Sequence, residues 1–186
     1  LHFRLHHEKG AMELVPGLVI DEVEGDVGNP DKLSMTFSGS LGALTIEASL
    51  ITIGDSGYIT NPLTGEWEAG PTGVSSLGFF DPSRGIAAMT SQVRGATVVG
   101  AIKTIGPFPF NATLIAGRLP ADALAPLVGE TVEGVTVEVL LTIDTDDLYL
   151  REARFEGPVT PTDAQDVVRV ITLSAFNAAV AIEPPL

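Results

Sequence analysis

The sequence predicts an α+β protein built on a strongly curved antiparallel sheet, a half-barrel of about ten strands with short helices on its concave face. Apolar and polar residues alternate in many short segments, which is typical of strands with one buried face. Only two short segments have helical spacing, and strands otherwise follow strands, which argues against a parallel sheet. No repeat or low-complexity tract divides the chain, so residues 1–186 are expected to form one domain.

The first part of the chain is predicted to be a series of strands separated by turns. The expected strands are residues 1–6, 18–27, 32–37, 44–53 and 58–60. In the fourth of these, Leu44, Ile46 and Leu50 fall on one face because side chains alternate along a strand. Asn29-Pro30-Asp31 and Asp55-Ser56-Gly57 supply turn signals between them.

Two helices are expected in the middle of the chain. Asp81-Pro82 has the pattern of an N-cap followed by a first-turn proline, and it predicts a helix from Pro82 to about Val93. Ile86, Met89 and Val93 recur at helical spacing, so this helix is expected to be amphipathic. A second helix is predicted over 120–127 with Leu124 on its apolar side, and Pro126 restricts it to one or two turns.

The last part of the chain returns to strands. They are expected at 96–105, 110–116, 135–143, 148–155 and 166–176. Val137, Val139 and Leu141 lie on one face of the third, and the acidic stretch 144–147 is predicted to form the turn of its hairpin with the fourth.

Composition excludes several classes of partner. Hydrophobic residues make up 45% and charged residues only 18%, below the roughly 25% that is usual in soluble domains. The net charge of −14 repels nucleic acids and anionic membrane surfaces. The chain has no cysteine, which removes disulfides and thiolate chemistry, and no run of about 18 apolar residues, which removes a transmembrane helix.

The polar motifs do not assemble into a metal site. His2, His6 and Glu8 have a superficial resemblance to a ligand set, but a polar edge-strand face near a chain end explains them better. A calcium loop that begins at Asp144 requires glycine at its sixth position and glutamate at its twelfth. Tyr149 and Phe155 occupy those positions, so an acidic hairpin turn is expected instead.

Nor do the motifs supply a catalytic apparatus. The serines of 38–40 and 75–78 lie outside a Gly-x-Ser-x-Gly elbow, and histidine occurs only within the first seven residues. The glycines have the spacing of turns and not that of a phosphate-binding loop. We therefore expect no catalytic residue, no metal and no cofactor, and we expect the protein not to be an enzyme.

The apolar surplus leaves two interpretations open. The apolar faces of the strands form an ordinary packed core, or helix residues such as Ile86 and Met89 fill the concave side only partly and leave a cavity for a hydrophobic ligand. Strand periodicity is the same in both cases, so it does not separate a filled sheet from one with a pocket.

Several segments, in order along the chain, resemble the LppX/LprAFG family of bacterial envelope lipoproteins. The most specific is the stretch from Tyr58 to Trp67, which is similar to the family's strand, Pro-x-Thr-Gly loop and tryptophan. The others are Leu1-His2-Phe3, the segment 23–27 with Lys32-Leu33-Ser34, the helix start 80–86 and the helix 119–124. The family's leading helix and its lipid-modified cysteine have no counterpart among these residues.

The resemblance implies a half-barrel related to periplasmic lipoprotein carriers, with a cavity that takes acyl chains of lipids or glycolipids. It implies an extracytoplasmic location at the cell envelope, membrane attachment through an N-terminal lipid anchor absent from this chain, and an envelope transporter as a further partner. The residues expected to line the cavity are Leu44, Ile46, Leu50, Ile86, Met89, Val93, Leu124, Val137, Val139 and Leu141. The alternative is an envelope interaction or structural module with a filled core, and an envelope hydrolase ranks behind both.

Overall fold

The computed structural model describes residues 1–15, 17–28, 31–70, 85–104 and 109–185. Almost all of the regular structure in these residues is strand. The strands are β1 (His2–Lys9), β2 (Met12–Val15), β3 (Leu18–Gly28), β4 (Lys32–Leu41), β5 (Leu44–Ile53), β6 (Ser56–Thr60), β7 (Trp67–Ala69), β8 (Arg94–Lys103), β9 (Asn111–Pro120), β10 (Thr136–Asp144), β11 (Leu150–Glu156) and β12 (Val168–Ser174). The helices are α2 (Ala87–Ser91), the 3₁₀ helix η2 (Ala121–Leu124) and α3 (Ala125–Val128).

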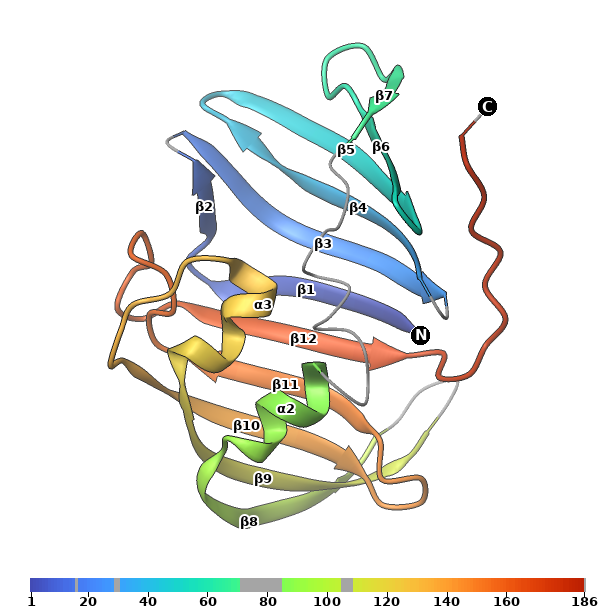
Figure 1. Cartoon of the computed structure of the whole chain (residues 1–186). Coiled ribbons are helices and arrows are strands. Elements are labelled where there is room, and N and C mark those ends of the chain that lie inside the picture. The colour runs from blue at the N-terminus through green and yellow to red at the C-terminus, as the bar shows by residue number, and fades with distance from the viewer. Residues whose placement is uncertain (16, 29–30, 71–84, 105–108, 186) are drawn as a thin grey trace.

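All twelve of these strands belong to one antiparallel sheet (Figure 1). Its order is β7-β6-β5-β4-β3-β1-β12-β11-β10-β9-β8, with β2 paired to β3 off this path. The order consists of two meanders, β3 to β7 and β8 to β12, and β1 lies between them. The prediction of an antiparallel sheet is confirmed.

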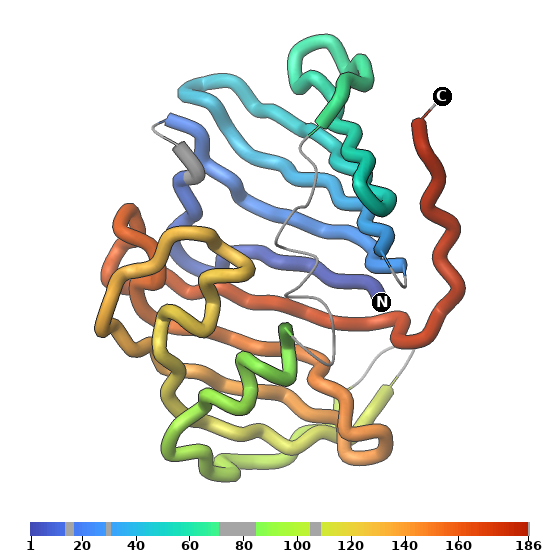
Figure 2. Tube along the Cα trace, in the orientation of Figure 1, coloured from blue at the N-terminus to red at the C-terminus, as the bar shows by residue number. Residues whose placement is uncertain are grey.

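The two meanders are joined by strands from opposite ends of the sequence. β1 pairs with β3 on one side and with β12 on the other, so that Leu5 lies opposite both Val23 and Ile171. Figure 2 shows the blue first strand beside the red last one, with the segment after β12 running on past the ends of the neighbouring strands. Lys32 Nζ donates a hydrogen bond to the Ile182 carbonyl at 3.1 Å, which fixes that segment to the start of β4.

Alternation gives the sheet one apolar and one polar face. Following the register from strand to strand, Leu50 on β5 lies opposite Met35, and Phe3 on β1 lies opposite Leu173. Many residues at the intervening positions carry polar groups. Thr36 Oγ1 contacts Ser49 Oγ at 3.1 Å on that side, and the Arg4 guanidinium makes two 2.7 Å bonds to the Glu22 carboxylate.

The helices pack on the apolar face, over β9 to β12 (Figure 1). Met89 of α2 and Leu124 of η2 belong to the same buried cluster as Phe3 and Phe155 of the sheet. Apolar side chains from both layers are thereby removed from water, which is the main stabilising contribution.

Several predicted boundaries differ from the structure. The described residues form twelve strands where about ten were expected, because β2 and β7 were not predicted. Leu148 does not begin a strand: its φ of 61° places it in the hairpin turn, and β11 begins at Leu150. The helix expected from Pro82 to Val93 ends earlier, at Ser91, and its predicted Asp81-Pro82 start lies outside the described residues.

Pro120 also takes a different role from the predicted one. It is the last residue of β9, with φ −59° and ψ 136°, and the helical turns begin only after it. Proline fixes φ near this value but leaves ψ free, so the same residue suits a strand end or a helix start. Pro126 lies in the first turn of α3, where its missing N–H is tolerated, and the segment splits into η2 and α3.

Candidate functional site

The candidate site is the buried cluster beneath the helices on the apolar face. Six of the ten residues predicted to line a pocket come together here, namely Ile86, Met89, Leu124, Val137, Val139 and Leu141. All six are less than 10% exposed. Ile86 directly precedes α2, Met89 lies in α2, Leu124 lies in η2 and the three others lie in β10, so the helical layer and the sheet each supply part of the cluster.

The other four predicted residues are distributed differently. Val93 packs on the rim of the cluster, just after α2. Ile46 and Leu50 are buried on β5, on the same face but outside the cluster. Leu44 is 58% exposed, since it lies opposite Leu41 beside the β4–β5 turn.

Val93 is held against the sheet by a glycine. A Cβ added at Gly117 of β9 meets Val93 Cγ1 at 2.5 Å and the Arg94 carbonyl at 3.1 Å. Only a residue without a side chain therefore lets the segment after α2 lie this close to β9. The contact fixes the end of α2 above the apolar face.

The apolar surface continues beyond the helices onto the first meander. Val23, Val27 and Met35 of β3 and β4 are half-buried and pack against the edge of the cluster. A continuous apolar strip thus runs from β10 across β1 to β4.

A pocket of about 490 Å³ lies at a different place, on the β6–β7 edge. Tyr58, Trp67, Glu68 and Pro185 are among its lining residues. None of the ten predicted residues lines it, so this pocket is separate from the candidate site.

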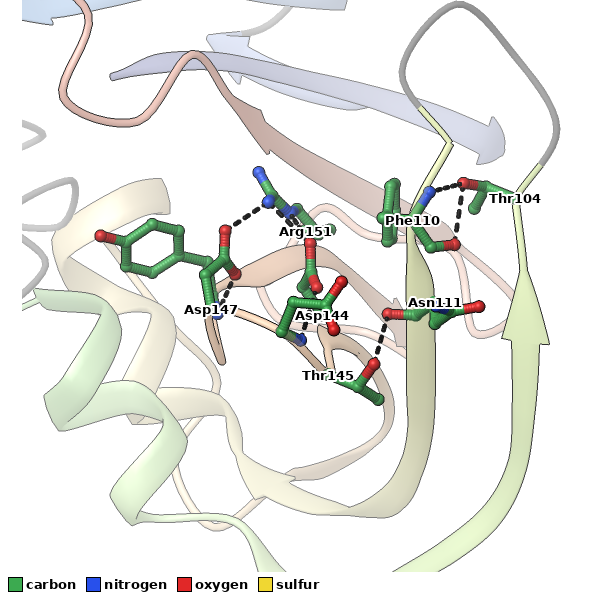
Figure 3. A network of polar contacts seen from close by, with 9 residues as sticks. Thr104, Phe110, Asn111, Asp144, Thr145, Asp147 and Arg151 are labelled. Carbon is green, nitrogen blue, oxygen red and sulfur yellow. Dashed lines mark hydrogen bonds and ion pairs between the residues drawn. The ribbon is translucent and has the colours of Figure 1, made fainter.

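A network of polar contacts lies at the β10–β11 turn of the second meander (Figure 3). Arg151 Nη2 donates to Asp144 Oδ2 at 2.7 Å and to Asp147 Oδ2 at 2.6 Å. Its guanidinium also lies 5.3 Å from the ring centre of Phe110 and 5.0 Å from that of Phe176. The acidic stretch predicted as a turn is therefore a turn whose carboxylates bind an arginine of the same hairpin.

Asp144 is ionised in this network. The Asp146 backbone N–H lowers the pKa of the Asp144 carboxyl, and the hydrogen bond from Arg151 lowers it further. Phe176, beyond β12, stacks on Tyr149 with ring centres 4.4 Å apart. The network joins the turn, β9 and the segment after β12.

A second buried ion pair lies on the apolar face itself. Arg169 of β12 is 1% exposed and donates through Nη2 to Asp163 Oδ1. Arg169 lies directly opposite Phe155 on β11 and His7 on β1. This pair was not among the predicted features, although an arginine that shares its strand face with the apolar Ile171 and Leu173 indicates a buried charge.

The histidines lie where strand alternation puts them. His2 Nδ1 is 3.0 Å from Asp26 Oδ1 on the polar face, and His6 shares that face. In the part of the chain that the structure describes, no three His, Asp or Glu side chains are grouped as metal ligands. None of its helices has the length and apolar character needed to cross a membrane.

The chain is similar to one family of lipoproteins and, in its fold, to two solved lipoprotein structures. The model of the LppX_LprAFG lipoprotein family matches residues 1–182. LprF from Mycobacterium bovis superposes with a TM-score of 0.73 at 17% identity, covering 99% of this chain and 88% of LprF. The Mycobacterium tuberculosis lipoprotein LppX gives a TM-score of 0.63 at 17% identity, covering 98% of this chain and 88% of LppX. No curated protein matches significantly.

Proposed function

Because the chain belongs to the LppX_LprAFG lipoprotein family, we propose that it is a non-catalytic carrier that binds acyl chains of lipids or glycolipids and moves them within the cell envelope. The acyl chains of the ligand lie on the concave side of a half-barrel, between the sheet and the layer of α2, η2 and α3. An N-terminal lipid anchor holds the carrier at the membrane outside the cytoplasm, where an envelope transporter is a further partner.

The continuous apolar strip carries this proposal. It joins the cluster under the helices to the half-buried Val23, Val27 and Met35 outside them, so an acyl chain entering between the layers stays in apolar surroundings. Each methylene kept from water contributes about 0.8 kcal/mol, which is what a carrier must supply in place of the bilayer. Of the ten residues predicted to line the cavity, all except Leu44 are the proposed contacts of the acyl chain.

One observation favours the alternative, a protein-interaction or structural module. Leu119, Leu124 and Val137 are at most 1% exposed, as in a filled core. Native mass spectrometry of the purified protein, followed by organic extraction, separates the two functions. Co-purified lipid supports the carrier, and lipid-free protein that also takes up no lipid from vesicles contradicts it.

A pair of matched variants tests the location of the site. Ile86→Asp/Met89→Asp places charges on the buried side of α2 and is expected to abolish lipid binding. Ala87→Asp/Ala88→Asp makes the same change on its exposed side and is expected to bind lipid normally. If the first variant unfolds, Met89→Trp replaces it in the test. The larger side chain fills space under the helix without adding a charge, and it is also expected to reduce lipid binding. Normal binding by the folded variants with changes at positions 86 and 89 removes those residues from the site.

A further inference from the structure

The apolar face contains an unexpected set of polar atoms near the start of β12. Arg169 has five N–H donors, and Asp163 takes one of them. Nε and Nη1 of Arg169 are buried and have no hydrogen-bond partner in the described part of the chain. Buried donors of this kind are rare in native proteins, because each forfeits the hydrogen bonds that it makes in water.

His7 adds an unpaired acceptor beside these donors. It lies directly opposite Arg169 in the β1–β12 ladder, on the same face of the sheet. His7 Nδ1 lies 3.5 Å from the Asp21 carbonyl oxygen, an arrangement that requires the proton on Nδ1. Nε2, also buried and unpaired in the described residues, is then a bare acceptor. Burial lowers the pKa of His7 and the Arg169 charge lowers it further, which keeps the ring neutral.

We propose that Arg169 and His7 form a polar subsite that binds a free hydroxyl group of the lipid. A hydroxyl oxygen accepts from the Arg169 guanidinium while its proton is donated to His7 Nε2, so one group satisfies both sides. The inference rests on the proposed carrier function and specifies which lipids it takes: those with an unesterified hydroxyl close to the acyl chain, in a sugar or a glycerol.

The charge of the subsite excludes other polar groups. Asp163 already neutralises Arg169, so a carboxylate or phosphate brings an uncompensated charge into an apolar region. An ester carbonyl accepts from Arg169 but has no proton for His7. Among these groups, the hydroxyl alone is uncharged and also both accepts from Arg169 and donates to His7.

The position of the subsite agrees with this ligand. Phe155, opposite Arg169 on β11, belongs to the apolar cluster, and so do Ile171 and Leu173, which follow on the same face of β12. A hydroxyl at Arg169 therefore places the adjoining acyl chain on the apolar strip.

The test is a competition in one sample. Lipid-extracted full chain is mixed with phosphatidylcholine vesicles that contain equal amounts of monoolein, oleyl glucoside and methyl oleate, and the lipids retained by the protein are measured by mass spectrometry. We expect each hydroxylated lipid to be retained over methyl oleate by about tenfold or more, because a site built to bind a hydroxyl rejects an analogue without one. The ratio of the two hydroxylated lipids tells a glycerol source from a sugar source.

Two variants connect the preference to the residues. His7→Leu removes the acceptor, and Arg169→Met/Asp163→Asn removes the ion pair as a unit so that no charge is left unpaired. Both are expected to bring the ratio of hydroxylated lipid to methyl oleate close to one. The shift of the Arg169 Nε–H resonance on adding monoolein reports the contact in the wild-type chain.

The outcomes separate the two proposals. Equal uptake of all three oleyl lipids by the wild-type chain overturns the hydroxyl subsite and leaves the carrier function intact. A preference that survives in both variants also overturns it. Failure to take up any lipid from the vesicles, phosphatidylcholine included, contradicts the carrier function, and the subsite with it.

Discussion

Asp163 has an unusually complete set of partners for a single side chain. It accepts hydrogen bonds from the backbone N–H groups of Val159 and Thr160, at 2.7 and 2.8 Å, from the Thr160 hydroxyl at 2.8 Å and from Arg169. Burial raises the pKa of Asp163, but these hydrogen bonds outweigh it and hold the pKa below its usual value. Asp163 is therefore ionised in the folded protein and fixes the loop before β12.

Replacing Asp163 is expected to be costly. Asp163→Asn leaves the Arg169 charge buried without a counter-ion, and we expect the free energy of unfolding to fall by about 3–5 kcal/mol in urea denaturation. The matched control is Asp166→Asn, which breaks the exposed 2.6 Å ion pair with Lys9 and is expected to have a much smaller effect. Equal losses in the two variants contradict the role given to Asp163.

The same residue predicts a pH dependence. The pKa of Asp163 is lower in the folded than in the unfolded protein, where it is about 3.9. Its carboxylate therefore stabilises the fold fully above about pH 4, and this stabilisation is lost as the pH falls through the folded-state pKa. Urea denaturation between pH 7 and pH 2 checks this, and Asp163→Asn is expected to lose less stability over the acidic part of that range.

Gly117 gives a packing prediction. Gly117→Ala brings a Cβ against Val93 Cγ1, and we expect a loss of about 1–3 kcal/mol in unfolding free energy from overpacking. Val93→Ala removes the methyl groups that clash with the new Cβ. In a Val93→Ala chain, Gly117→Ala is therefore expected to lower the unfolding free energy by less than it does in the wild-type chain. Gly100→Ala is the control, since its Cβ meets only Leu114 at an ordinary 3.6 Å.

Single residues also show where sequence reasoning failed. Met89 and Leu124 could be assigned to the buried side because helical spacing determines which side chains share a face. Arg169 could not be recognised as half of an ion pair, because its partner lies in a loop without periodicity. Leu44 has the alternation of Ile46, but alternation does not show that the end of a strand extends beyond the packed layer.

At the level of elements, length decided which strands could be predicted. β5 and β10 were found because nine or ten residues with clear alternation leave little ambiguity. β2 and β7 have only four and three residues, too few for a period of two to stand out, and pairing with β3 and β6 is what makes them strands.

β8 is an edge strand with exposed apolar side chains. Val98 is 70% exposed, Val99 58% and Ile102 42%, and among the described residues the strand pairs only with β9. An apolar edge with unpaired backbone groups is prone to pair with another chain.

A charge on this strand is expected to reduce such pairing. We expect Val99→Lys to lower concentration-dependent self-association, measured by light scattering, with a stability change within about 0.5 kcal/mol. Thr97→Lys is the control, because it adds the same charge to an exposed polar position of β8. If both variants act equally, net charge and not the apolar edge controls association.

For the molecule as a whole, the acidic excess is the dominant electrostatic feature. The chain has 24 acidic and 10 basic residues, and mutual repulsion of the excess disfavours the compact state. This charge can be read directly from the sequence, and so can the apolar face of the strands. Whether that face is covered by a packed core or by a bound lipid cannot be predicted from the sequence, because both have the same alternation of apolar and polar residues.

Salt is therefore expected to stabilise the protein. Raising NaCl from about 0.01 M to 0.15 M shortens the screening length from about 30 to 8 Å, and we expect the melting temperature to rise. Glu130→Lys/Glu133→Lys changes two exposed residues and brings the net charge from −14 to −14 + 4 = −10. This variant is expected to melt higher at low salt and to respond less to NaCl, and a melting temperature that falls with salt contradicts the argument.

The pairing of β1 with β12 has a consequence for how the chain is made. β1 leaves the ribosome about 160 residues before β12, a delay of about 10–30 s at the usual rate of synthesis. Throughout that time β1 and the meander that follows it have an open edge where the last strand belongs. The middle of the sheet is therefore completed last, and the open edge of β1 is expected to need a chaperone until residues 168–174 are available to pair with it.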